Sequence, residues 1–116
     1  MSDPLREPTF LILAALAPRP LHGYAIIGEV AALSGGRLSL RPGTLYGALD
    51  RLAADGLVEP DREVLVEGRM RRYYRLSEAG AAVLTSEAHR LRRNADAAEH
   101  RLAARSRRLR PARLSV

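Results

Sequence analysis

Apolar side chains recur at helical spacing in the first half of the chain, in short segments that proline and glycine separate. The first segment, residues 8–16, is densely apolar, and prolines follow it directly. The second, residues 21–34, places Ile26, Val30 and Leu33 on one face and ends at a pair of glycines. The pattern predicts two helices, of which the first is mostly buried.

A third helical segment begins at Pro42 and ends before Gly56. Proline suits the first turn of a helix and glycine suits its end. Its buried face is marked by Leu45, Leu49 and Leu52. Three short helices separated by tight breaks are therefore predicted in the first half of the chain.

From Leu57 onwards the apolar spacing changes to that of strands. Strand-like runs at residues 57–58 and 64–66 precede a turn-forming sequence at residues 67–69, and residues 71–76 then alternate. This spacing predicts a β-hairpin. The two faces of its second strand consist of Arg72, Tyr74 and Leu76 on the core side, and Arg71, Tyr73 and Arg75 on the other.

Ser77 is a favourable N-cap residue for a last helix, which is predicted to continue to about Arg108. Its apolar residues are separated by alternating steps of four and three, a heptad seam formed by Leu84, Ala88, Leu91, Ala95, Ala98 and Leu102. The seam predicts homodimerisation, because the preceding elements already supply a core; folding back along its own domain is the alternative. Alanine buries little area, at about 25 cal/mol per Å², so contacts from the first helix are expected to contribute.

Charge favours an anionic partner: the 116-residue chain has a net charge of +6, and all nineteen of its strongly basic side chains are arginine. Arginine suits phosphate well, although a GC-rich genome also explains the absence of lysine. Residues 37–76 hold eight arginines and six acids, whereas residues 77–116 hold nine and four. Residues 68–76 hold no acid and carry Arg69, Arg71, Arg72 and Arg75.

Composition also argues against several classes of protein. No apolar run is long enough to cross a bilayer and no signal-peptide pattern is present, so a cytoplasmic protein is expected. Cysteine is absent, and His89 and His100 do not form a metal motif. No nucleophile, base and orienting group occur together, so neither an enzyme nor a cofactor is predicted.

Residues 40–80 combine a short helix with an arginine-tipped hairpin, the layout of a helix-turn-helix followed by a β-wing. We therefore predict a mainly α fold with a small β-hairpin, in which a winged helix-turn-helix over residues 1–76 binds double-stranded DNA. A long C-terminal dimerisation helix follows over residues 77–108, and a basic tail over residues 109–116. The recognition helices of a dimer should address half-sites about one helical turn apart.

Three runs of sequence resemble the PadR family of bacterial transcriptional regulators: LAPRPLHGYAI at 16–26, PGTLYGALDRLAADGLV at 42–58 and GRMRRYYRLSEAG at 68–80. The resemblance implies a winged helix-turn-helix with a single dimerising C-terminal helix. Gly47 and Met70 depart from it, since each stands where the family commonly has proline. Gly47 is expected to loosen the third helix by roughly 1 kcal/mol relative to alanine.

The third helix supplies the first predicted DNA contacts. Arg41, Thr44 and Tyr46 lie near its N-terminus, where helices bind phosphate and where recognition helices read bases. Arg51 lies further along the same exposed face. The alternatives are that Tyr46 packs on the wing or the second helix, and that Arg51 forms a surface ion pair with Asp55.

On the hairpin, Arg69 and Arg71 are expected to contact the DNA backbone or minor groove, followed by Arg72. Tyr73 either supports the wing or touches a sugar. Each phosphate contact should add about 0.9 to the slope of log K against log salt. His22 is interpreted as a residue that caps the second helix or fills space at its start.

The resemblance further implies a small apolar or aromatic effector near the dimer interface, where Phe10, Leu91 and Ala95 would line its space. The sequence thus predicts a specific DNA-binding regulator that acts as a homodimer on a near-palindromic operator, by default as a repressor. The alternative is a basic protein that binds RNA or coats the nucleoid without sequence preference.

Overall fold

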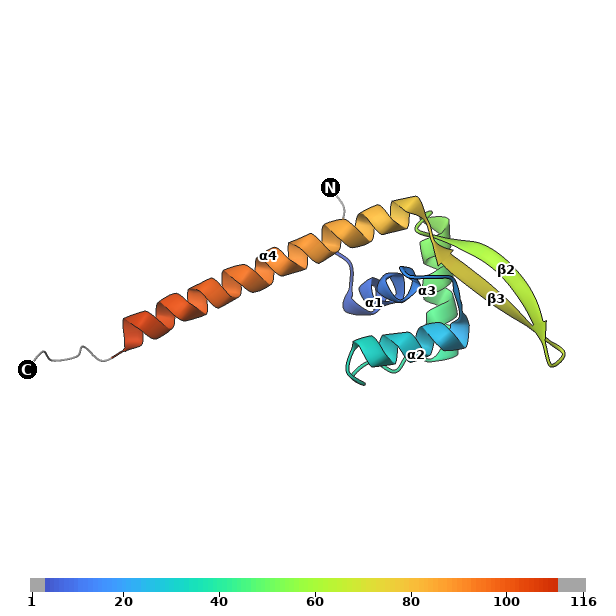
Figure 1. Cartoon of the computed structure of the whole chain (residues 1–116), viewed down its shortest axis with the longest axis horizontal. Helices are drawn as coiled ribbons and strands as arrows, with labels where there is room; N and C mark the ends of the chain where they lie inside the picture. Colours follow the sequence, from blue (N-terminus) through green and yellow to red (C-terminus); the bar gives the residue numbers. More distant parts are fainter. Residues whose placement is uncertain (1–3, 111–116) are drawn as a thin grey trace, which may run out of the picture.

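The computed structural model describes residues 4–110, which form an elongated molecule of 80 × 31 × 22 Å (Figure 1). A bundle of short helices and a small sheet lie at one end, and a long helix extends away from them. The predicted mainly α fold is confirmed. In chain order the elements are α1 (Glu7–Leu16), β1 (Leu21–His22), α2 (Gly23–Leu33), α3 (Pro42–Ala54), β2 (Val58–Val66), β3 (Arg69–Leu76) and α4 (Glu78–Leu109).

The helices begin close to the predicted positions, except that α2 begins two residues later than predicted because Leu21 and His22 form β1. Prolines occupy the first turns of α1 and α3. At α2, the backbone N–H of Ala25 donates to Nδ1 of His22 over 3.5 Å, which confirms His22 as a cap. At α4, the N–H of Gly80 donates to Oγ of Ser77 over 2.9 Å.

The hydrophobic core lies between α1, α2, α3 and the sheet, and α1 and α3 supply most of it. The residues predicted to face inward on α2 and α3 are buried, with one exception. Leu33 is the exception, because the buried face of α2 continues from Val30 to Ser34 and leaves the Leu33 side chain 52% exposed. Burial of apolar area at about 25 cal/mol per Å² drives the packing. The largest fully buried side chains are Ile12, Leu13, Leu16, Ile26, Leu45, Leu49, Val30 and Val58.

The sheet is antiparallel in the order β1-β3-β2. The two-residue strand β1 was not predicted; it pairs Leu21 with Tyr74 and His22 with Tyr73. The two short runs predicted before the turn are the ends of one nine-residue strand, which a bulge at Asp61 interrupts. Between β2 and β3, Glu67 and Gly68 have φ of 49° and 78°, as a tight two-residue hairpin turn requires.

The first turns of α4 pack on the domain, and the rest of the helix does not. Gly80 is buried against the start of the hairpin, where an added Cβ would lie 2.0 Å from the carbonyl oxygen of Leu57. The N–H of Leu5 and the guanidinium of Arg90 both donate to the carboxylate of Glu87, and Arg90 foremost lowers the pKa of that group. From residue 91 to 110 every side chain is exposed. Most of the predicted basic tail, residues 111–116, lies outside the described residues.

Candidate nucleic-acid interface

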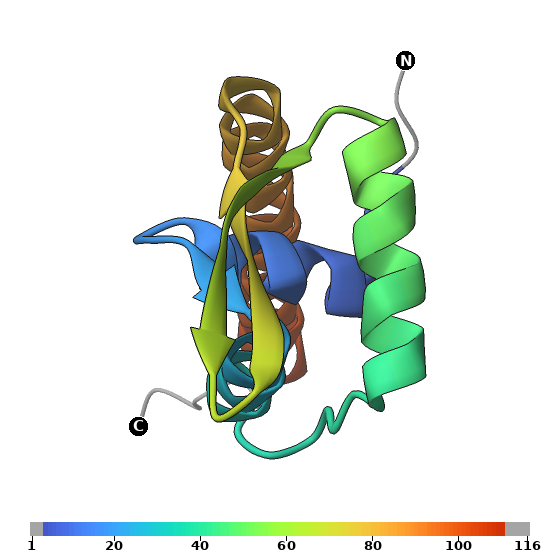
Figure 2. The ribbon, with the colours of Figure 1, turned by 90° about the vertical axis from the view of Figure 1, so that its right-hand side faces the viewer.

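The start of α3 and the turn of the wing, defined as the β2–β3 hairpin, point to the same side of the domain. Figure 2 shows α3 beside the wing, with both of these ends at the bottom of the view. A cleft of about 520 Å³ lies between the wing and the start of α2, and Tyr46 of α3 also lines it. Its lining consists of His22, Gly23, Tyr24, Tyr46, Val66, Glu67, Arg69, Met70, Arg71 and Arg72.

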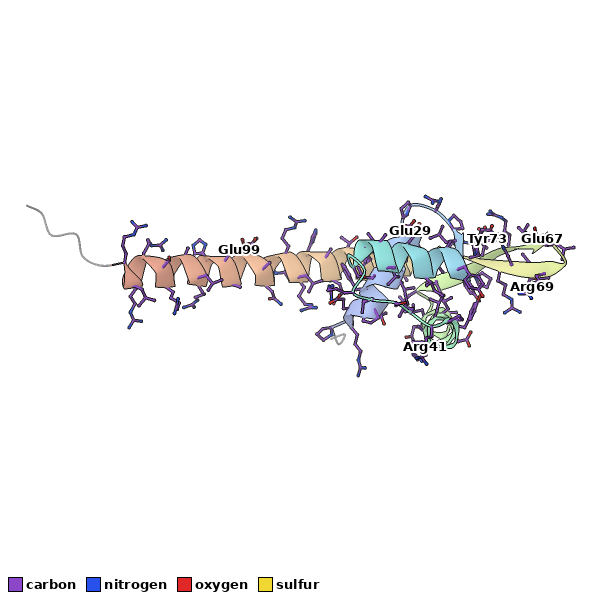
Figure 3. All side chains as sticks on the ribbon, turned by 90° about the horizontal axis from the view of Figure 1, so that it is seen from below. Glu29, Arg41, Glu67, Arg69, Tyr73 and Glu99 are labelled. Carbon is purple, nitrogen blue, oxygen red and sulfur yellow. The ribbon has the colours of Figure 1, made fainter. Side chains whose placement is uncertain are left out.

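All four residues of α3 that the sequence nominates for DNA contact are exposed, namely Arg41, Thr44, Tyr46 and Arg51. Arg41 is the N-cap residue, and its side chain does not cap the helix. Backbone N–H groups of the first turn therefore remain available for an anion. Figure 3 shows Arg41 at this end of α3.

Tyr46 both packs and remains accessible. Its hydroxyl lies so close to α2 that a Cβ at position 23 would approach it to 2.4 Å, which explains the glycine there. The side chain is nevertheless 42% exposed. Arg51 reaches back toward Gly47, where its Nη1 would lie 3.7 Å from a Cβ. Within residues 4–110, no ion pair joins Arg51 to Asp55.

The wing arginines fall into two groups. Arg72 pairs with Glu63 across the hairpin, with 3.3 Å between Nε and Oε1. Arg75 donates to Glu59 over 2.7 Å and to Asp61 over 3.3 Å, and these hydrogen bonds, the first above all, raise its pKa. Arg69 and Arg71 make no ion pair among the described residues. Figure 3 shows Arg69 near the far end of the wing.

Tyr73 is held between two other side chains. The guanidinium carbon of Arg62 lies 4.1 Å from the centre of its ring, as in a cation–π contact. The His22 ring meets it edge-on at 5.3 Å between centroids. Burial, and secondarily Arg71, lower the pKa of His22, which favours the neutral form that caps α2. Tyr73 thus supports the wing on α2, as one of the two sequence interpretations expects.

Family membership follows from the sequence. The model of the Transcriptional regulator PadR-like family matches residues 12–86. The chain belongs to this family. It is 45% identical over 76 residues to a transcriptional regulator of Mycobacterium tuberculosis, covering 66% of this chain and 67% of that protein. It is 49% identical over 83 residues to an uncharacterized 37.1 kDa protein in a transposon of Streptomyces fradiae, covering 72% of this chain but only 22% of that protein.

Solved structures of PadR proteins share the fold. A PadR family transcription regulator from Clostridium difficile superposes with a TM-score of 0.70 at 23% identity, over 84% of this chain and 99% of that one. Bacillus subtilis PadR in complex with operator DNA gives a TM-score of 0.62 at 23% identity, over 70% of this chain and 46% of that one. The winged-helix architecture predicted from the sequence is therefore confirmed.

In this PadR-like chain the predicted heptad seam is divided. Leu84 and Ala88 are half-buried, and Leu84 packs on the core of its own domain. The other four seam residues, Leu91, Ala95, Ala98 and Leu102, are exposed. The predicted effector-lining residues are likewise split, since Phe10 is half-buried in α1 while Leu91 and Ala95 face solvent. Within one chain they do not enclose a space.

Two features of the site were missed from the sequence. Glu59, Asp61 and Glu63 neutralise wing arginines, and Arg62 stacks on Tyr73, although it precedes the arginine-rich strand. Only the strand register, with its bulge, places these residues opposite one another.

Within residues 4–110 no helix is long and apolar enough to cross a membrane. The same residues contain no group of three or more potential ligands that could hold a metal ion.

Proposed function

We propose that this protein is a homodimeric regulator that binds a near-palindromic DNA operator and represses transcription by occupying it. One observation carries the proposal: the uncapped N-terminus of α3 and the turn of the wing lie on one side of the domain. Arg69 and Arg71 follow this turn in β3 and form no ion pair among the described residues. The family and the operator complex of Bacillus subtilis PadR support it. In this proposal residues 1–76 bind DNA and residues 77–108 dimerise.

In the proposed complex, α3 enters the major groove with Thr44 and Tyr46 facing base edges or sugars. Arg41 contacts a phosphate beside the first turn, and Arg51 extends along the same face of the helix. The wing contacts the adjoining backbone or minor groove through Arg69 and Arg71. Phosphate contacts position the protein, and the few base contacts provide specificity.

The dimer is proposed to form through the outer part of α4, residues 91–109. Its exposed apolar side chains, Leu91, Leu102 and Leu109, lie on a helix that is otherwise highly charged. A second α4 would cover them and set the two recognition helices about one turn of DNA, roughly 34–36 Å, apart. An apolar effector is proposed to bind where the partner helix closes the space beside Phe10, Leu91 and Ala95.

Genomic footprinting followed by binding measurements tests the proposal. The protein should protect a two-fold symmetric site and bind it at least about 10³-fold more tightly than unrelated duplex DNA at physiological salt. Sedimentation should give twice the chain mass at micromolar concentration. Equal affinity for unrelated duplexes and RNA would instead identify a non-specific nucleic-acid-binding protein, and a monomer would remove the two-fold operator.

A further inference from the structure

Two large apolar side chains face solvent near the end of the wing. Leu65 is 67% exposed and Met70 is 58% exposed. They are direct partners in the β2–β3 ladder, so their side chains lie on the same face of the hairpin. Together they form an apolar pair, next to the two-residue turn, that no described element covers.

The face that carries the apolar pair is turned toward α3. Met70 alternates with Arg72 and Tyr74 along β3, and Tyr74 is buried in the core. Met70 and Tyr46 line a groove of about 500 Å³ between the wing and α3. A DNA strand that passes between the recognition helix and the wing would run beside this pair.

Charge around the pair indicates what covers it. Arg69 and Arg71 are the sequence neighbours of Met70, and neither forms an ion pair among the described residues. Glu63, two residue pairs further from the turn, is engaged by Arg72. Because neighbours in a strand point to opposite faces, Arg69 and Arg71 lie on the other face of the hairpin. A hairpin end that is apolar on one face and cationic on the other fits a polyanion that also presents apolar area. In duplex DNA, the deoxyribose rings along the minor groove provide that area between the phosphates.

We infer that Leu65 and Met70 form an apolar contact with the deoxyribose walls of the minor groove, while Arg69 and Arg71 bind the flanking phosphates. This contact rests on the proposed DNA-binding function and adds to it a component that salt does not screen. Sugar contacts carry no direct sequence information. The pair therefore contributes affinity equally on operator and unrelated duplexes.

Two double variants test the contact. Leu65→Asn with Met70→Gln keeps the size of both side chains and makes them polar, whereas Leu65→Met with Met70→Leu keeps them apolar. On duplex DNA the polar variant should lose about tenfold in affinity with an unchanged salt slope, and the apolar variant should bind as the wild type does. Circular dichroism and thermal melting verify that both variants fold.

Several outcomes would overturn the inference. The first is that the polar variant binds duplex DNA as tightly as the wild type. The second is that it loses affinity only together with a decrease in the salt slope. An equal loss on single-stranded DNA, which has no minor groove, would also contradict it. If the wild type itself fails to bind duplex DNA, the proposed function falls as well; if only the polar variant is unaffected, the proposed function stands and the contact does not.

Oxidation provides an independent measurement, because Met70 and Met1 are the only sulfur-containing residues of the chain. Hydrogen peroxide transfers one oxygen to the Met70 sulfur and leaves as water, which gives a polar sulfoxide. The oxidised wild type should lose duplex affinity at an unchanged salt slope, and Met70→Leu should be resistant. Unaltered binding after complete oxidation of Met70, verified by mass spectrometry, would contradict the contact.

Discussion

The base and the tip of the wing each carry two arginines of β3, in different surroundings. The base, residues 58–63 and 72–76, has its arginines paired with acids across the hairpin, and Tyr74 is buried. The tip, residues 64–71, carries Arg69 and Arg71 without ion pairs and the exposed pair of Leu65 and Met70. The opposite strand, rather than the arginine itself, decides which arginines remain available for DNA.

The largest effect is expected where the base is fixed to α4. Gly80→Ala would force a Cβ against the Leu57 carbonyl and the Leu76 side chain, and backbone cannot yield easily. The free energy of unfolding should fall by about 3 kcal/mol, as measured by urea denaturation. Gly28→Ala, on α2 with nothing within 4 Å of the new Cβ, is the matched control and should stabilise the protein by about 1 kcal/mol.

The two groups of arginines should differ in the salt dependence of DNA binding. Arg69→Ala with Arg71→Ala should lower the slope of log K against log salt by about 1.8, because two phosphate contacts are lost. Arg72→Ala with Arg75→Ala should change it by less than about half as much, since these arginines already neutralise carboxylates. Fluorescence anisotropy across a salt series measures both slopes. Equal changes would show that the cross-strand pairs open on binding DNA.

The backbone conformation of Glu67 provides a test at the tip of the wing. Its φ of 49° lies in the left-handed region, which asparagine tolerates better than glutamate. Glu67→Asn should therefore raise the free energy of unfolding by about 1 kcal/mol and remove an acid from the tip. Glu67→Ala removes the charge without relieving the backbone, so an equal gain in thermal stability from both variants would argue against this cause.

The smallest effect is expected from removing the acidic partner of an arginine in the base, so that this arginine becomes unpaired like those of the tip. Glu63→Gln removes the partner of Arg72, and DNA affinity should rise by about threefold, the scale of an exposed ion pair. Glu99→Gln removes the same charge from the outer part of α4, which Figure 3 shows far from the wing. Similar gains from both variants would mean that net charge alone is responsible.

Local pattern was sufficient for most of the fold. The leucines of α3, the proline and serine helix starts and the alternation of β3 each depend on neighbours within a few residues. The two-residue β1 has no such pattern, because its pairing with Tyr73 and Tyr74 exists only in the tertiary structure. Leu33 fits the apolar period of α2, but the tertiary structure buries the neighbouring Ser34 instead.

The candidate site was harder to predict than the fold, because it too depends on contacts that exist only in the tertiary structure. The run from Gly68 to Leu76 contains no acid, so its four arginines look alike in the sequence. Their difference depends on a register that a bulge at Asp61 shifts by one residue. Nor does the sequence indicate that Gly80 allows the backbone of the hairpin to approach α4, which only the tertiary structure shows. The DNA contacts themselves remain predictions.

Only Ser77 separates the last residue of β3 from the first residue of α4. Its hydroxyl donates to the Gly56 carbonyl and accepts from the Gly80 N–H, so the junction is hydrogen-bonded on both sides. The wing and α4 are therefore expected to move together as one rigid unit. In the proposed dimer, a change in the angle between two α4 helices would therefore alter the distance between the two wings, and operator spacing would report on events at the far end of the molecule.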